Sequence, residues 1–326
     1  MKIALLGTGV YGFAIAMAIN KNHKDITMWT EDEEKYEKYV ENGKKIKDII
    51  KGYEAPSNIK LTISYEKACQ DADVIFITST AAYVGEICKN INQYISKKTV
   101  VCIASKGIEN TSCAFLSDIA FATLKTKHIA IISGPSFAID MVANNPVGLS
   151  LATHSKKAIK YVKDALESDT LKLRPTNDLI GVQICGSVKN IIAVAAGMLD
   201  GMGYPESTRS FLITEALNDI KNLIAALGGN PKTINSFSGV GDLLLTCTSI
   251  KSRNFSFGKF VGEGATKEQK KEHLETHTVE GYYTLKSIYK LIKNKKIKMP
   301  IIDLMYKIIM QDEDPKMLIS FLVNKK

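Results

Sequence analysis

One lysine stands alone in a long apolar segment of the sequence. Lys189 is the only charged residue between Leu179 and Leu199. An ammonium group among apolar side chains must find polar partners or lower its pKa, and a lysine with a lowered pKa exchanges protons near neutral pH. Lys189 is therefore a candidate acid and base in catalysis.

Two structural alternatives compete with a catalytic role for Lys189. About twenty mainly apolar residues are enough to span a bilayer. A mid-bilayer lysine, however, costs roughly 2.5 to 3.5 kcal/mol on insertion scales, and the chain has no second comparable segment. The other alternative is a buried core helix whose lysine extends its stem to the surface. Taken by itself the segment favours this core helix, and we expect no membrane insertion.

The N-terminus carries a glycine pattern typical of dinucleotide binding. An apolar strand precedes Gly7-Thr-Gly9-Val-Tyr-Gly12, and a helical run follows it. In such a turn the first glycine permits the bend, the second lets the backbone approach a pyrophosphate, and the third allows close packing of helix on strand. A second strand, Ile26–Trp29, ends just before Glu31 and Asp32. A carboxylate at this distance is placed to bind a ribose hydroxyl.

The N-terminal segment also has features of a secretory signal, because Lys2 precedes a mainly apolar stretch that reaches Ile19. Three glycines interrupt that stretch, and no small-residue cleavage site follows it. The cysteines are scattered and lie mostly in apolar segments, which is typical of reduced thiols in a protein core: Cys69, Cys88, Cys102, Cys113, Cys185 and Cys247. We therefore expect a cytoplasmic protein.

Composition indicates a globular protein of one or two domains. The chain has 326 residues, of which 45% are hydrophobic and 24% charged, so it can bury a sizeable core. A net charge of +9 could indicate nucleic-acid binding. The lysines are spread along the chain without a basic motif interleaved with aromatic residues, so no nucleic-acid partner is expected. A positive surface does favour encounters with an anionic small molecule.

The first half of the chain alternates short apolar strands with helical segments, a rhythm that predicts a Rossmann-type, mainly parallel α/β sheet. The expected strands after Ile26–Trp29 are 60–63, 74–78, 100–104, 129–133, 147–152 and 171–174. After Asn177 apolar residues recur at helical spacing. We therefore expect a dinucleotide-binding domain over residues 1–176 and an all-α substrate and catalytic domain over 177–326.

Four further segments hold polar residues that a simple core does not need. Lys106 follows the strand at 100–104, so its ammonium should stand at the carboxyl edge of the sheet. Ser136 follows the strand at 129–133, and Pro135 could start a helix whose N–H groups donate hydrogen bonds to an oxyanion. Asp242 and the run Ser252-Arg253-Asn254 complete the set. Each of these residues also has a purely structural interpretation, as a surface charge or a helix cap.

Jointly these residues describe one chemistry. An ammonium with a nearby carboxylate can pass a proton to a carbonyl oxygen, and a guanidinium can grip a phosphate. A nicotinamide supplies the hydride in such reactions. The combination predicts reversible reduction of a phosphorylated ketone.

Seven motifs, in this order, resemble NAD(P)-dependent glycerol-3-phosphate dehydrogenase of the bacterial type: GTGVYG, SKGIE, SGPSFA, GSVKN, GVGDLLLTC, SRN and TVEGY. The family interconverts sn-glycerol 3-phosphate and dihydroxyacetone phosphate and supplies the backbone of glycerophospholipids. The resemblance implies that Lys189 donates and accepts the proton, with Asp242 beside it.

The resemblance also implies two sets of binding residues. The substrate contacts would be Lys106, Gly134, Ser136, Lys189, Asp242, Ser252, Arg253 and Asn254. The cofactor contacts would be Val10, Tyr11, Lys106, Ala138, Arg253 and Glu280, in addition to Gly7, Gly9 and Gly12 of the glycine turn and Glu31 after the second strand. By the same resemblance the cofactor would be NAD(H) or NADP(H), and the substrate would be a phosphorylated three-carbon compound.

This chain departs from the family pattern at three points. Many members carry an arginine after the second strand, where this chain has Thr30-Glu31-Asp32. A carboxylate repels a 2′-phosphate, so we expect NAD(H) to be preferred over NADP(H), although Lys35 could compensate. Ser207 stands where the family has asparagine, and Glu215 where it has arginine. Any salt bridge that the family makes at the latter position must be rebuilt or absent.

Two histidines and the cofactor-binding pattern each allow another interpretation. His273 and His277 lie one helical turn apart, but Leu274 occupies the position of a zinc protease's glutamate and no third ligand is apparent, so no metal is expected. A dehydrogenase of the β-hydroxyacid type would need a clamp for a carboxylate instead of a phosphate. A non-catalytic dinucleotide sensor would not need Lys189 and Asp242 together. A homodimer is compatible with the sequence, which does not fix the oligomeric state.

Overall fold

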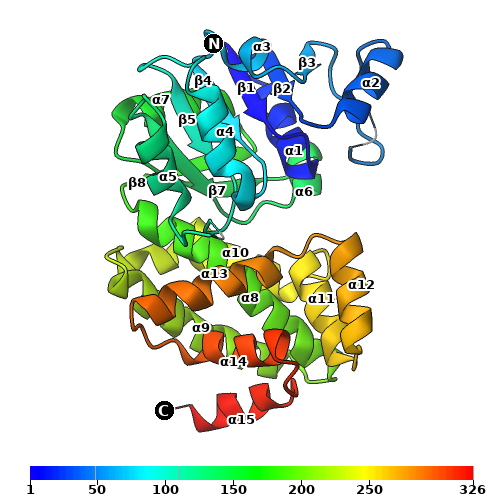
Figure 1. Cartoon of the computed structure of the whole chain (residues 1–326), viewed down its shortest axis with the longest axis vertical. Coiled ribbons are helices and arrows are strands. Elements are labelled where there is room, and N and C mark those ends of the chain that lie inside the picture. Colours follow the sequence, from blue (N-terminus) through cyan, green and yellow to red (C-terminus); the bar gives the residue numbers. More distant parts are fainter. Residues whose placement is uncertain (48, 110, 326) are drawn as a thin grey trace. The chain divides into compact units, whose positions relative to one another are not determined.

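The computed structural model describes residues 1–47, 49–109 and 111–325. Contacts divide the chain into two compact units, and each is described by itself (Figure 1). The first comprises Met1–Lys106 and Phe115–Leu179, and the second comprises Gly107–Ala114 and Ile180–Lys326. Sequence reasoning placed one division near Thr176, whereas the contacts change unit after Leu179 and group the short segment Gly107–Ala114 with the second unit.

An eight-stranded sheet forms the centre of the first unit, in the order β3-β2-β1-β4-β5-β6-β7-β8. Adjacent strands are parallel except β6 and β7, which are antiparallel. The strands are β1 (Ile3–Leu6), β2 (Ile26–Trp29), β3 (Ile59–Thr62), β4 (Val74–Ile77), β5 (Val100–Ile103), β6 (Ile129–Ser133), β7 (Val147–Ala152) and β8 (Leu171–Thr176).

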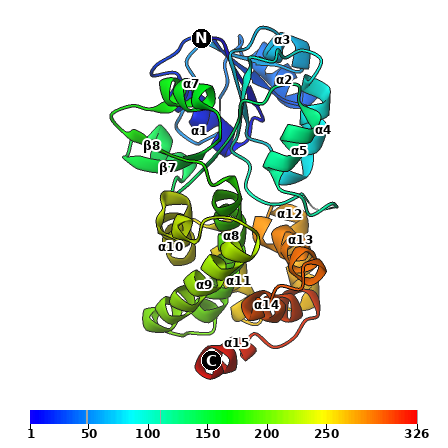
Figure 2. The same cartoon turned by 90° about the vertical axis from the view of Figure 1, so that its left-hand side faces the viewer.

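Helices cover both faces of this sheet. Figure 2 shows α1 and α7 on one face and α3, α4 and α5 on the other. The helices of this unit are α1 (Val10–Ile19), α2 (Glu33–Glu41), α3 (Tyr65–Cys69), α4 (Val84–Ile91), α5 (Leu116–Thr123), α6 (Ala138–Val142) and α7 (Lys156–Leu166), with a short 3-10 turn at Ala81–Tyr83. Because both faces are covered, the inner strands β1, β2, β4 and β5 are buried along their whole length.

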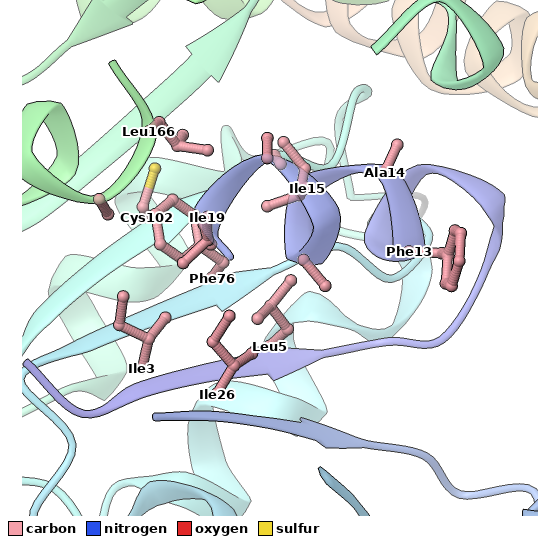
Figure 3. Packing of buried hydrophobic residues seen from close by; sticks show 14 of the residues in the cluster. Ile3, Leu5, Phe13, Ala14, Ile15, Ile19, Ile26, Phe76, Cys102 and Leu166 are labelled. Carbon is pink, nitrogen blue, oxygen red and sulfur yellow. The ribbon is translucent and has the colours of Figure 1, made fainter. Parts of the chain in front are cut away.

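The core beneath α1 explains why this helix shows no polar face. Phe13, Ile15 and Ile19 are fully buried and belong to the same core cluster as Ile3 and Leu5 of β1 (Figure 3). A helix packed against a sheet on one side and other helices on the other must be apolar all round. The glycine turn between β1 and α1 is thereby fixed by a rigid strand and a rigid helix.

The strand order places a crevice at a predictable point. The chain runs outward from β1 to β2 and β3, then returns to add β4 on the other side of β1. Ligands of open parallel sheets bind beyond the carboxyl ends of the strands where the order reverses. The turns after β1 and β4 are therefore where a dinucleotide is expected.

Apart from the segment Gly107–Ala114, the second unit is built from helices in the part of the chain that the structure describes. They are α8 (Leu179–Gly201), α9 (Glu206–Ala226), α10 (Asp242–Thr248), α11 (Arg253–Gly262), α12 (Lys267–Thr276), α13 (Glu280–Asn294), α14 (Pro300–Met310) and α15 (Met317–Asn324), with a 3-10 turn at Pro231–Asn235 and a π turn at Phe237–Gly241. Figures 1 and 2 show α8 among the other helices of this unit.

α8 is long and apolar enough to cross a membrane, but its most apolar window is 94% buried inside the protein. Its close packing against α11 depends on glycine. A Cβ atom at Gly197 would stand 2.0 Å from the carbonyl oxygen of Phe255, and one at Gly258 would stand 2.0 Å from that of Val194. The two backbones therefore touch, and a side chain at either glycine would force the helices apart.

The predicted fold class is confirmed, and the predicted strands agree with the observed ones to within two residues at each end. One local prediction is wrong: Pro135 does not start a helix. α6 begins at Ala138, and Phe137 is its N-cap with extended backbone angles. Residues 134–137 form the connection between β6 and α6, so Ser136 lies on a loop before the helix.

Candidate functional site

The three glycines of the N-terminal turn have three different environments. Gly7 adopts a φ of +125°, which disfavours any side chain. A Cβ at Gly12 would stand 2.4 Å from the carbonyl oxygen of Gly7, so helix and strand approach too closely for alanine. At Gly9 a Cβ would meet no atom within 4 Å. Gly9 therefore faces open space, and its backbone is accessible to a ligand.

The N-terminus of α1 is suited to a phosphate. Gly9 is its N-cap, and no side chain caps the helix. The first turn contains no acidic residue. Uncapped N–H groups and the positive end of the helix dipole favour an anion, so the turn fits the pyrophosphate of a dinucleotide. Val10 is half exposed at this end of the helix.

A cavity of about 310 Å³ lies beyond the ends of β1, β2 and β4. Its walls include Gly7 and Gly9 from the first turn and Glu31 from the end of β2. Asp32 also lines it, but one of its oxygens already accepts a hydrogen bond of 2.9 Å from the backbone of Lys35. Glu31 is exposed and free of a capping role in α2. An exposed carboxylate that caps no helix therefore lines this cavity.

Four predicted site residues of the first unit converge. The Lys106 ammonium donates to the carbonyl oxygen of Gly134 at 3.4 Å, and the Ser136 hydroxyl donates to the same oxygen at 3.3 Å. The Tyr11 hydroxyl lies 3.0 Å from the Ser136 hydroxyl. Tyr11 belongs to α1, so it links the glycine turn to the group around Gly134, and Ala138 begins the helix that packs beside α1.

The Gly134 position itself requires glycine. A Cβ there would stand 2.6 Å from the carbonyl oxygen of Gly148 in β7. The group thus offers an ammonium and two hydroxyls on a backbone that tolerates no side chain. These are donors for the oxygens of a small polar or anionic molecule.

Lys189 of α8 has partners on another helix of the second unit. Its ammonium donates to the Asp242 carboxylate at 2.6 Å and to the Thr246 hydroxyl at 2.9 Å. The side chains of Lys189 and Asp242 are 8% and 1% exposed, so this ion pair is buried. The carboxylate favours the protonated lysine and opposes the effect of burial. The Lys189 side chain therefore does not extend to the surface, in contrast to the alternative of a core helix whose lysine reaches solvent.

The turn before α10 places Asp242 opposite Lys189. Gly239 has a ψ of −110°, which lies outside the helical range. A Cβ at Gly239 would stand 2.0 Å from the carbonyl oxygen of Ile234. Asp242 then occupies the first turn of α10, and Thr246 follows four residues later on the same face. Close packing thus requires glycine at position 239 of the G-x-G-D sequence, and the turn formed there positions the Asp242 carboxylate.

The first turn of α11 gathers the residues expected to bind phosphate. Ser252 is its N-cap and accepts a hydrogen bond from the backbone of Phe255 at 3.3 Å. Arg253 is exposed at the first helical position. The side-chain amide oxygen of Asn254 accepts a hydrogen bond of 2.8 Å from the backbone N–H of Gly281. The N–H groups of the same Asn254 side chain can then donate elsewhere. A guanidinium and an amide at a helix N-terminus form a suitable anion site.

Glu280 begins α13 and accepts a hydrogen bond of 3.1 Å from Asn190, the residue after Lys189. A Cβ at Gly281 would stand 2.6 Å from the carbonyl oxygen of Asn190. Helices α8, α11 and α13 therefore meet at Asn190, Asn254 and Gly281. This contact brings together the segments GSVKN, SRN and TVEGY, which are far apart in the sequence.

Comparison with known proteins places this geometry in a family. Residues 2–159 match the model for the NAD-dependent glycerol-3-phosphate dehydrogenase N-terminus, and residues 178–320 match the model for its C-terminus. The chain belongs to this family. The predictions of the family and of a dehydrogenase are confirmed.

Relatives match over nearly the full length. A glycerol-3-phosphate dehydrogenase [NAD(P)+] of Staphylococcus epidermidis is 34% identical and covers 95% of this chain and 94% of its own. One from Bacillus subtilis is also 34% identical and covers 94% of this chain and 90% of its own. The crystal structure of glycerol-3-phosphate dehydrogenase from Coxiella burnetii has a TM-score of 0.92 at 28% identity and covers 99% of both chains. The hydroxyacid and sensor alternatives are not favoured by these matches.

Sequence reasoning gave no role to two residues that contact the site. Thr246 was quoted within a motif, and its signal was the spacing of four residues from Asp242 on one helix. Asn190 follows Lys189 directly, yet its bond to Glu280 required a contact across 90 residues. Only the first of these could have been found from local spacing.

Glu215, which stands where the family has arginine, forms an ion pair in this chain. Lys325, near the end of the chain, lies 3.1 Å from the Glu215 carboxylate and 2.8 Å from that of Asp219. Its side chain is 13% exposed, so these are largely buried contacts between the segment after α15 and α9. Ser207 is exposed in the first turn of α9, and nothing in the structure explains its replacement of asparagine.

The paired histidines take part in ring packing. The rings of His273 and His277 stack with centroids 4.4 Å apart, and His273 also packs on Phe257 and Phe260. No group of three potential metal-ligating side chains occurs among residues 1–47, 49–109 and 111–325.

All six cysteines are buried, and burial raises the pKa of the Cys247 thiol beside Lys189 and Asp242.

Proposed function

We propose that this member of the family reduces dihydroxyacetone phosphate to sn-glycerol 3-phosphate with NADH and catalyses the reverse reaction with NAD+. Residues 1–176 would serve as the dinucleotide-binding domain and residues 177–326 as the substrate and catalytic domain. The observation that carries the proposal is the buried ion pair of Lys189 and Asp242, with its 2.6 Å contact.

Lys189 would give its proton to the carbonyl oxygen of the ketone as the carbonyl becomes a secondary alcohol. In the reverse direction the neutral lysine would take the proton from the C2 hydroxyl. Asp242 holds the ammonium in place and supplies its countercharge, and Thr246 fixes it from a second side. General acid catalysis by a positioned group contributes about 10²- to 10⁴-fold to a rate.

Two groups of donors would recognise the substrate. Arg253 and Asn254, with the Ser252 hydroxyl, would bind the phosphate at the N-terminus of α11. Lys106, Ser136 and the backbone at Gly134 would bind the remaining oxygens of the three-carbon chain. A cationic and amide-rich set of this kind favours a phosphate dianion over an uncharged ketone.

The residues of the first unit fit a nicotinamide dinucleotide. Gly7, Gly9 and Gly12 would hold the pyrophosphate with Val10 and Tyr11 beside it, and Glu31 would bind the adenosine ribose. The resemblance adds contacts from Lys106, Ala138, Arg253 and Glu280. The bound nicotinamide would supply or accept the hydride. Because Glu31 and Asp32 repel a 2′-phosphate, NAD(H) would be preferred, with NADP(H) as a second cofactor.

The cellular setting follows from the same assignment. The product would supply the backbone of glycerophospholipids, and the enzyme would act in the cytoplasm without inserting into a membrane, which the 94% burial of the apolar α8 window supports. A homodimer would be compatible with this activity. The dispersed lysines support an anionic small-molecule substrate and not a nucleic acid.

The test is NADH oxidation with dihydroxyacetone phosphate, compared with unphosphorylated dihydroxyacetone. We expect turnover of the phosphorylated ketone only, and a loss of at least about 10²-fold in kcat for Lys189→Ala because the proton donor is removed. Lys293→Ala, which removes a half-exposed lysine paired with Asp303, is the matched control and should retain activity. Near-normal kcat in Lys189→Ala would remove this lysine from the mechanism.

A further inference from the structure

Lys35 stands at the junction of two cavities beside the glycine turn. The 310 Å³ cavity and a second one of about 420 Å³ share only Thr8, Gly9, Asp32 and Lys35 among their described linings. The Lys35 ammonium donates to the Thr8 hydroxyl at 3.2 Å. The Thr8 hydroxyl donates in turn to Thr30 at 3.1 Å, so Lys35 is tied to the turn after β1 and to the end of β2.

The backbone also fixes Lys35 in this position. Asp32 is the N-cap of α2 and accepts from the Lys35 N–H at 2.9 Å. Lys35 is consequently the third residue of the helix, in its first turn. A cation there is opposed by the helix dipole, whereas an anion is favoured. The Lys35 side chain is 39% exposed, so a ligand in the cavity can reach its ammonium.

The charges around Lys35 are mixed. Its ammonium lies 3.9 Å from the Asp32 carboxylate, which is a loose contact on a half-exposed pair. Glu31 lines the same cavity and Glu34 lines the second. Lys38, Lys45 and Lys47 line the second cavity as well. A phosphate at the junction meets the Lys35 ammonium, which lines both cavities, but also the repulsion of Glu31 and Asp32. Such a balance weakens binding of a phosphorylated ribose without excluding it.

We propose that Lys35 is a specificity-determining residue that receives the 2′-phosphate of NADP(H), in place of the arginine that this chain lacks after β2. The inference rests on the proposed use of a nicotinamide dinucleotide. It assigns opposite roles to neighbouring residues: Glu31 selects the free ribose hydroxyl of NAD(H), and Lys35 admits its phosphorylated counterpart.

Lys38 does not share this position, although it lies one turn further along α2. Its ammonium contacts the Glu34 carboxylate at 2.6 Å, and both side chains are highly exposed. It lines only the second of the two cavities. Lys38→Ala therefore removes one positive charge from the same helix without removing the proposed contact, which makes it a matched control.

Trp29 provides a binding signal that does not depend on turnover. It is the single tryptophan of the chain, and it lines the 310 Å³ cavity while stacking on Tyr65 at 4.0 Å. Titration of Trp29 fluorescence with NADP+ and with NAD+ gives the two dissociation constants in wild type, Lys35→Ala, Lys35→Met and Lys38→Ala. Lys35→Met retains the aliphatic stem and guards against a loss of packing.

We expect wild type to bind both dinucleotides, NAD+ more tightly. Both Lys35 variants should weaken NADP+ by about tenfold more than NAD+, the effect of losing one charge-assisted hydrogen bond. Lys35→Arg should bind NADP+ at least as well as wild type, and Lys38→Ala should change neither constant appreciably. An unchanged ratio in the Lys35 variants, or no NADP+ binding by wild type, overturns the inference. Because no turnover is measured, failure of the proposed reaction would appear separately, as binding without oxidation of NADH.

Discussion

Each unit holds its own group of candidate site residues, and the two groups are built differently. In the first, the decisive elements belong to the main chain: glycines after β1 and the uncapped N-terminus of α1. In the second, they are side chains of different helices joined by a buried ion pair between Lys189 and Asp242. A site built from the main chain depends on local backbone angles, whereas a site built from side chains depends on how whole helices pack.

This difference predicts two kinds of sensitivity to mutation. A main-chain site fails when a side chain is added, because the added atoms occupy space that the ligand or a neighbouring strand needs. A side-chain site fails when a charge is removed, because its partner is then left buried without compensation. Glycine substitutions in the first unit and charge-neutralising substitutions in the second are therefore the informative experiments.

The largest effect is expected for Asp242→Asn. The amide keeps the size of the side chain and can accept a hydrogen bond from Lys189, but it no longer compensates the ammonium. We expect kcat for ketone reduction to fall at least about 10²-fold. Without the carboxylate the ammonium also loses its proton more readily, so the remaining activity should decline at a lower pH than in wild type. A pH profile of kcat measures both effects.

The control for this prediction is Asp303→Asn, which neutralises a carboxylate paired with Lys293 at the surface of the same unit. It should leave both the rate and the pH profile close to those of wild type, because exposed pairs contribute little. If Asp242→Asn lowered kcat without moving the pH profile, the carboxylate would act by positioning the lysine and not through its charge.

A smaller effect is expected from a pair of glycine substitutions in the first unit. Gly9→Ala adds a methyl group into open space, so the melting temperature should hold while NADH binds about tenfold more weakly. Gly12→Ala places a Cβ 2.4 Å from a carbonyl oxygen, which should destabilise the fold by about 1 to 3 kcal/mol. Thermal unfolding and NADH titration distinguish the two results.

Each of the two glycine substitutions serves as the control for the other. If Gly9→Ala bound NADH as tightly as wild type, the backbone at this position would not be where the dinucleotide approaches. If Gly12→Ala unfolded at the wild-type temperature, the close contact of α1 and β1 would not limit this position. Either result would weaken the distinction between a main-chain site and a side-chain site.

The smallest effect concerns Glu109, in the short segment grouped with the second unit. Burial opposes the change, but hydrogen bonds from Ser112 and Thr111 lower the pKa of this carboxyl from 4.5 to about 2. A lowered pKa gives stability that is present above pH 4.5 and is lost as the pH falls towards 2. Glu109→Gln should therefore melt slightly below wild type at pH 6, and the difference should vanish near pH 2. Melting curves across this range measure it.

Much of the first unit could be predicted from the sequence because its signals are local. Alternating apolar strands and helices gave the sheet, and the spacing of Gly7, Gly9 and Gly12 gave the turn. The prediction for Pro135 was wrong since a proline compatible with a helix start does not force one, and the helix began at Ala138. The antiparallel pairing of β6 with β7 has no local signal, because register is decided by strands distant in sequence.

The candidate residues of the second unit were also named from the sequence, but their relations were not. Lys189 stood out because a charge in an apolar helix is costly, which is a local fact. Its 2.6 Å contact joins residues 53 positions apart, and Lys325 finds Glu215 across a still longer separation. Only the packing of helices, with glycine backbones in contact at Gly197 and Gly258, brings such groups within hydrogen-bonding distance.

The sequence by itself therefore determined the fold class, the glycine turn and the identity of the residues that can do chemistry, because backbone preferences and the cost of burying charge act within a few residues. The tertiary structure decided which of them meet. Hydrogen bonds and ion pairs weaken within an ångström of misplacement, and that precision comes from close-packed helices and strands far apart in the chain. Lys189, an isolated charge in the sequence, becomes a paired and oriented ammonium only in the folded unit.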